Sequence, residues 1–183
     1  MAPVSTSIDL LCMEVAMLSS AWVAEMARYN AWQNGVLYDI CDGLAPDVRD
    51  GDRGLFFGSI SHTLDHILMV DRFLLGTVKG EKQEAFSPKR RLFADWADLK
   101  HERTLTDHAL IGFADTTPDD FYASSFTVWS ESLQKHRTVI KGLLVAQMFN
   151  HQTHHRSQAT SELHRLGIDY GVTDMPFRPD TPG

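Results

Sequence analysis

The chain has 183 residues, of which 43% are hydrophobic and 22% charged, with a formal net charge of −7. This composition excludes a disordered or collagen-like chain and suits a single domain, residues 1–183, with a sizeable core. The acidic balance opposes a nucleic-acid partner, since binding to duplex DNA calls for a broad basic face. The two cysteines, Cys12 and Cys41, form no CxxC pattern and are interpreted as buried, unreactive thiols of a cytoplasmic protein.

The first helix is predicted over residues 13–42, because Gly43 and Pro46 follow it directly. The partly apolar start of the chain lacks a basic segment, and Glu14 interrupts its apolar run. We therefore interpret this start as a lead-in and first helix and not as a signal peptide. The chain has no run of about 18 apolar residues, so neither a membrane-spanning helix nor a membrane partner is expected.

Gly and Pro punctuation outlines three further long amphipathic segments. They are expected from Leu55 to Gly76, from Leu92 to a fading end at residues 112–118, and from Ser130 or Thr138 to Leu166, with Gly167 as the C′ residue. Aromatic and β-branched side chains at residues 120–129 predict a short strand or hairpin, and the tail, residues 173–183, is expected to be extended. Together these elements predict an all-α fold, a four-helix bundle with a short β-hairpin or extended stretch before the last helix.

Three of the chain's nine histidines lie within residues 151–155. An α-helix turns by about 100° per residue, so His155 falls about 40° from His151 and on the same face. His154 lies about 100° from His155, near the edge of that face. The same face carries an apolar stripe, which should point into the bundle: Ile140, Leu144, Met148 and Leu166. His151 and His155 are therefore expected to point inward.

Two imidazoles one helical turn apart on an interior face form half of a metal site, and the alternative is a pair of hydrogen-bonded core histidines. The second segment offers His62 and His66, which are also four residues apart, and helical phase favours His66 only slightly. Asp71 falls in the apolar stripe of that segment, either as a partner for an imidazole or paired with Arg72 or a base from another segment. The remaining histidines stand in polar stretches and are expected to be solvated: His101, His108, His136 and His164.

Three stretches resemble the DinB family and its relatives, the YfiT-like metal hydrolases and thiol-dependent transferases. Residues 29–34, "YNAWQN", resemble the family's first-helix pattern, and residues 56–76, "FFGSISHTLDHILMVDRFLLG", resemble its second helix. Residues 149–167, "FNHQTHHRSQATSELHRLG", resemble the fourth-helix signature HxxxHR(G)Q. The chain departs from the family pattern at Ser157, where Gly is common, and at Ser61, another common histidine position. The departure at Ser61 leaves the role of the adjacent His62 open.

The resemblance implies a divalent metal, with Zn, Ni or Fe foremost, held by His66, His151 and His155 with one side open. It also implies frequent homodimers, and a thiol S-transfer or hydrolase activity on a small thiol or an anionic substrate. No catalytic residue is identified. Arg156, Gln152 or Tyr29 are candidates to orient an anionic substrate, although a surface or inter-helix pair is the preferred interpretation of Arg156.

The alternative to an enzyme is a non-catalytic metal-binding protein of the stress response, as the damage-inducible name of the family suggests. The chain has no HExxH motif and no Glu-x-x-His pair, which mildly favours this alternative or chemistry driven by the metal itself. A third hypothesis, a structural or DNA-associated role, is opposed by the acidic charge.

Overall fold

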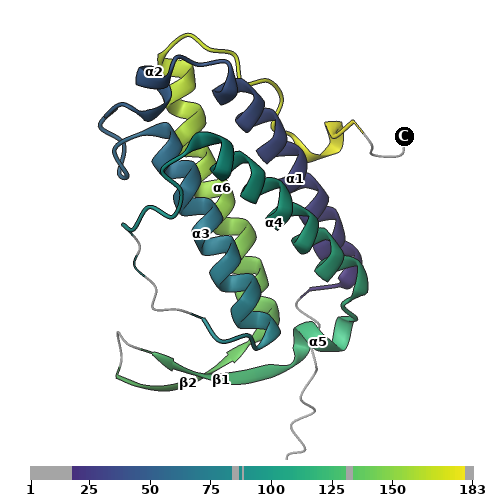
Figure 1. Ribbon diagram of the computed structural model, residues 1–183. Coiled ribbons are helices and arrows are strands. Elements are labelled where there is room, and N and C mark those ends of the chain that lie inside the picture. The colour runs from purple at the N-terminus through teal and green to yellow at the C-terminus, as the bar shows by residue number, and fades with distance from the viewer. Residues whose placement is uncertain (1–17, 84–86, 88, 131–133, 180–183) are drawn as a thin grey trace, which may run out of the picture.

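The computed structural model describes residues 18–83, 87, 89–130 and 134–179, in which four long helices run side by side (Figure 1). The long helices are α1 (Ser20–Asp42), α3 (Ile60–Lys79), α4 (Trp96–Thr116) and α6 (Lys141–Arg165). The shorter elements are α2 (Pro46–Asp50), α5 (Asp119–Ala123), the strands β1 (Ser125–Ser130) and β2 (Lys135–Ile140), and the 3-10 turn η1 (Met175–Phe177). The predicted helical bundle with a short hairpin before the last helix is confirmed, while the assignment of one domain stays a prediction.

Capping side chains set where the helices begin, and the observed starts lie later in the chain than the predicted ones. The hydroxyl oxygen of Ser19 accepts the N–H of Trp22 at 3.2 Å, so α1 begins at Ser20. Leu18 and Ser19 are not helical, and the predicted start at residues 13–17 lies outside the described residues, as does Cys12. In the same way, the Ser59 hydroxyl caps α3 and the Asp95 carboxylate caps α4, so both helices begin later than their apolar patterns suggest.

Glycines decide two of the helix ends. Helix α3 continues past Gly76 and ends at Lys79, because Gly80 takes the left-handed conformation, with φ 80°. After α6, Gly167 has φ 73° and its N–H donates to the carbonyl of His164 at 2.9 Å. The N–H of Ile168 donates to the carbonyl of Leu163 at 2.9 Å, which completes a Schellman motif. The prediction of Gly167 as the C′ residue is confirmed.

The hairpin replaces the predicted first turns of the last helix. Residues 125–130 pair antiparallel with residues 135–140, so Thr138 and Ile140 belong to β2. Ile140 is consequently 37% exposed and does not extend the interior stripe of α6, contrary to the prediction. The first part of the stretch predicted as a strand, up to Ala123, is the short helix α5.

Two apolar clusters fill the bundle, one toward each end. Helix α3 packs mainly against α6, and α1 mainly against α4. One cluster gathers around Val23, Val145 and Phe149, and the other around Leu37, Leu64 and Leu163. Cys41 belongs to the second cluster and is fully buried, and this burial raises the pKa of its thiol to about 12. The prediction that Cys41 is buried is confirmed, and its lack of reactivity stays a prediction. None of the described helices is long and apolar enough to cross a bilayer.

A layer of buried charged and amide side chains separates the two apolar clusters along all four long helices. Its centre is Arg103 on α4, whose Nη1 lies 2.5 Å from Asp71 on α3 and whose Nη2 lies 2.8 Å from Asp107. Burial raises the pKa of Asp71 to about 6, and the guanidinium of Arg103, which lies against the carboxylate, opposes that rise. Of the partners predicted for Asp71, the base from another segment is thus correct. Arg72 instead pairs with Glu102 at 2.9 Å.

Amide side chains extend this buried polar layer to α1 and α6. The Nδ2 of Asn34 on α1 donates to Asp107 at 2.9 Å. On α6, the Nη1 of Arg156 donates to Oε1 of Gln152 at 2.8 Å and to Oδ1 of Asn34 at 3.4 Å. Arg156 is therefore buried and contacts another helix, so the inter-helix part of its predicted role is confirmed and the surface part is wrong.

Replacing Arg103 with methionine should destabilise the fold strongly. The variant R103M leaves Asp71 and Asp107 buried without their cation, and breaking a buried pair on one side costs about 3–5 kcal/mol. The matched variant R72M breaks only the exposed pair with Glu102 and should cost less than about 1 kcal/mol. Denaturant unfolding at pH 7 measures both. Similar free energies of unfolding for the two variants would show that the layer is dispensable.

Candidate metal centre

The close packing of α3 and α6 brings three histidines together near the middle of the bundle. His66 projects from α3 and meets His151 and His155, which lie one turn apart on α6. One ring nitrogen from each lies within 4.8 Å of the others, and the Nε2 atoms of His66 and His151 are 3.1 Å apart. A tetrahedral metal with bonds of about 2.0–2.1 Å separates its nitrogen ligands by roughly 3.3 Å, so the histidines are close enough to hold one.

The three imidazoles are buried to different degrees. His66 and His155 are 4% and 9% exposed, whereas His151 is half-buried. The ring of Phe57 stacks on His66 with centroids 4.0 Å apart and packs edge-on against His155 at 5.4 Å. A surface hollow borders the cluster at His151, and we call it the His151 hollow; it is lined by Gln147, Asn150, His151, Thr153, His154 and Ser157. The cluster is therefore covered at Phe57 and accessible at His151.

Burial keeps the imidazoles of α6 neutral. It lowers the pKa of His151 to about 3, and the neighbouring imidazoles, His155 first among them, shift the pKa in the same direction. Burial also lowers the pKa of His155, although a hydrogen bond to Gln158 opposes this shift. Neutral imidazole is the form that offers a lone pair to a metal, so these two side chains are in the ligating state at neutral pH.

Gln158 orients His155 from the same helix. Its Oε1 lies 2.8 Å from Nδ1 of His155, so it accepts the proton held there and leaves Nε2 as the nitrogen with the lone pair. For His151, Nδ1 has no hydrogen-bond partner among the described residues, and its Nε2 faces His66. A carbonyl-type oxygen behind a histidine is the usual support of a metal-binding imidazole.

The structure separates the predicted site residues into two groups. His66, His151 and His155 come together, while His62 stays outside the cluster, with its ring 5.8 Å from that of Phe57. His154 is exposed, as its position near the edge of the helix face predicted. The four histidines expected to be solvated are also exposed: His101, His108, His136 and His164. In the described part of the chain, no carboxylate joins the three imidazoles.

A sequence model of the DinB family matches residues 13–182, nearly the whole chain. The chain belongs to the DinB family. No match was found among the curated proteins or among the solved structures. Membership of the DinB family accords with the cluster of three imidazoles, whose ring nitrogens are donors of the kind that Zn, Ni and Fe accept.

Two supports of this DinB-family site were not predicted from the sequence. Gln158 is the last residue of the HxxxHR(G)Q signature. Its position three residues after His155 on one helix face could have indicated that the two side chains are in contact. Phe57 lies in the loop before α3, and nothing in its local pattern indicates a contact with two imidazoles.

Removing one of the three imidazoles should abolish metal retention. We expect one divalent ion per chain in the purified DinB-family protein. The variant H151A should weaken binding by more than the roughly 10–100-fold loss caused by changing a residue behind a ligand. The neighbouring variant H154A, which removes an exposed ring, should bind as the wild type does. Elemental analysis and competition with a chelator measure both; equal metal content in H151A and wild type would contradict this assignment.

Proposed function

We propose that the chain is a metal-dependent enzyme that uses a low-molecular-weight thiol, or water, as its nucleophile. The observation that supports this best is that three protein imidazoles converge without a fourth ionisable donor among the described residues. Structural metal sites usually have four protein ligands, whereas catalytic sites have three and an open position. If His66, His151 and His155 held a metal, a small molecule would approach it from the His151 hollow, the opening that borders the cluster.

Of the residues around the three histidines, one excludes water and another orients an imidazole. Phe57 covers His66 and His155 and keeps water from that side, so a ligand approaches at His151. Gln158 holds the proton on Nδ1 of His155 and fixes the ring for ligation through Nε2. A divalent metal, once bound, lowers the pKa of a thiol or water that coordinates it.

In the thiol transfer, the thiol loses its proton to solvent and its sulfur forms a new bond to an electrophilic carbon. The leaving group departs from that carbon with the bonding electron pair. His154 stands exposed at the edge of the His151 hollow, with its ring centroid 4.7 Å from that of His155, and is placed to pass the proton to solvent. Hydrolysis follows the same scheme with water in place of the thiol.

The alternative is a metal-binding protein of the stress response without catalysis. It is favoured by one observation, that no carboxylate joins the imidazoles in the described part of the chain to act as a general base. A homodimer, a cytoplasmic location and a thiol or anionic substrate remain our proposals for either function.

Thiol transfer should depend on His66 and be independent of His62. The metal-loaded wild type is mixed with a low-molecular-weight thiol and 1-chloro-2,4-dinitrobenzene, and the rate of conjugate formation is followed by absorbance. We expect H66A to lose at least about 100-fold in rate, on the scale by which removing a catalytic electrostatic group lowers turnover. The variant H62A, four residues away and outside the cluster, should keep the wild-type rate. If the metal-loaded protein neither forms the thiol conjugate nor hydrolyses an ester, the enzymatic proposal is wrong and the non-catalytic alternative stands.

A further inference from the structure

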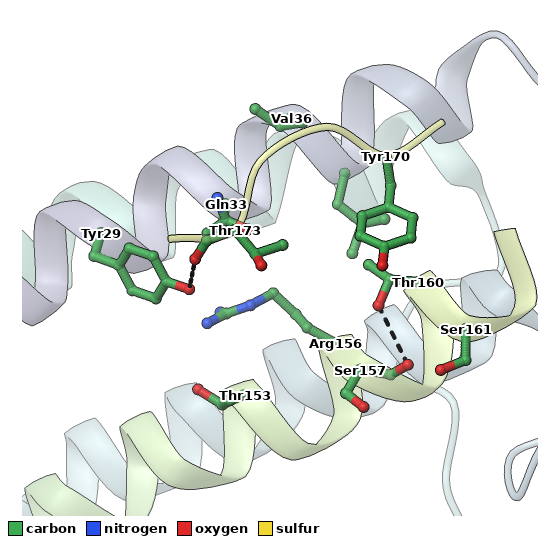
Figure 2. Close-up of a pocket in the computed structure, with 11 residues that line it drawn as sticks. Tyr29, Gln33, Val36, Thr153, Arg156, Ser157, Thr160, Ser161, Tyr170 and Thr173 are labelled. Carbon is green, nitrogen blue, oxygen red and sulfur yellow. Dashed lines mark hydrogen bonds between the residues drawn. The ribbon is translucent and has the colours of Figure 1, made fainter. Parts of the chain in front are cut away.

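A second cavity lies on another flank of α6, between α1, α6 and the segment 170–173 (Figure 2). We call it the Arg156 pocket. Its volume is about 290 Å³, near the lower limit of about 300–1,000 Å³ for small-molecule pockets. None of the three clustered histidines lines it, although it shares Thr153 and Ser157 with the His151 hollow.

The C-terminal segment forms one wall of this pocket and is fastened to α1. The hydroxyl of Tyr29 donates to the carbonyl of Thr173 at 2.7 Å, and Nε2 of Gln33 donates to the carbonyl of Val172 at 3.1 Å. Further along, Arg178 pairs with Glu25 on α1 at 3.0 Å. In the predicted extended tail, residues 173–183, residues 173–174 have no regular secondary structure, Met175–Phe177 is a 3-10 turn contrary to the prediction, and residues 180–183 lie outside the described residues.

Arg156 is the one cationic side chain among the described residues that line the pocket, and no acidic residue lines it. Its side chain is 6% exposed, and Figure 2 shows it reaching from α6 into the space beside Tyr29. Its Nη1 donates only to the neutral amides of Gln152 and Asn34, and its Nη2 has no hydrogen-bond partner among the described residues. Arg103 holds the carboxylates of the buried layer, so no carboxylate contacts Arg156 directly, and the Cζ atom of Arg156 lies 5.7 Å from the centroid of the Tyr29 ring that lines the pocket.

A buried guanidinium whose hydrogen-bond partners are only neutral amides keeps an uncompensated positive charge, and an anionic group that enters the pocket beside Arg156 offsets that cost. The hydroxyl groups of the lining add a second requirement. The side chains of Tyr29, Thr153 and Thr160 donate their protons to backbone carbonyls, at 2.7, 3.1 and 3.2 Å. In this arrangement each of these three hydroxyl oxygens can accept a hydrogen bond from a ligand, so hydroxyl or amino groups on the ligand would match them.

We propose that the Arg156 pocket binds a small organic anion that also carries hydroxyl or amino groups, with the carboxylate or phosphate of that molecule on Arg156. The site does not depend on the metal. It adds a second recognition surface on the helix that carries two of the three histidines.

Calorimetric titration of the full chain tests this site with three probes. Gluconate and glucose 6-phosphate carry the anion as a carboxylate and as a phosphate, and sorbitol is the uncharged counterpart of gluconate. We expect at least one of the two anions to bind and sorbitol to bind at least tenfold more weakly. The variant R156Q should weaken anion binding at least tenfold, since it removes a charge-assisted hydrogen bond. The variant R165Q, which removes an exposed arginine of the same helix, should bind as the wild type does.

Two further variants separate the possible outcomes. The variant T160F keeps Arg156 but places a large ring in the pocket, so it should also lose anion binding. This variant tests the proposal even if R156Q does not fold. H66A should keep anion binding, because the metal centre is elsewhere. Failure of both anions to bind wild type, sorbitol binding as tight as gluconate, or unchanged affinity in T160F or a folded R156Q would each overturn the proposal. Binding that is lost in H66A and kept in R156Q would place the anion on the metal and overturn it as well.

Discussion

The ion pairs of Arg103 with Asp71 and Asp107 hold the centre of this bundle, and the geometry of both candidate sites depends on them. Through Asn34 they connect to Gln152 and Arg156, so one layer of charged and amide groups joins all four long helices. Apolar packing tolerates small rotations of a helix about its axis, but a buried polar layer requires each donor to face its acceptor. The layer therefore fixes the rotation of α6. Once Gln152 and Arg156 face α1, the preceding residues, His151 and His155, face α3 and His66.

Helix α6 thus carries two kinds of functional side chain on adjoining faces. Neutral imidazoles face α3, where burial and Phe57 keep them unprotonated and partly dry. The guanidinium of Arg156 faces α1, beside hydroxyl groups and the C-terminal segment. His155 and Arg156 are neighbours in the sequence, so a change in the twist of α6 moves both sites together. Thr153 and Ser157 line both the His151 hollow and the Arg156 pocket, which places the two openings side by side along the helix.

The sequence predicted the helices and the inward direction of His151 and His155, because both follow from local periodicity. It did not predict the starts of α3 and α4, where the capping residues Ser59 and Asp95 override the apolar pattern, or the strand at residues 135–140, which forms through pairing with β1. Helical phase favoured His66 over His62 only slightly, and the resemblance to the DinB family decided between them. The contact of Phe57 with His155 and that of Arg103 with Asp71 join residues far apart in the chain, so no local pattern could indicate them.

X-ray absorption at the metal edge, on the purified full chain, tests the open three-histidine centre most directly. The account predicts a first shell of three imidazole nitrogens at about 2.0–2.1 Å and at least one light-atom ligand that exchanges when a small thiol is added, with sulfur then entering the shell. The imidazole contribution should fall from three to two in H66A. A closed shell of four protein ligands, a shell that contains cysteine sulfur before any thiol is added, or a spectrum unchanged in H66A would contradict the account.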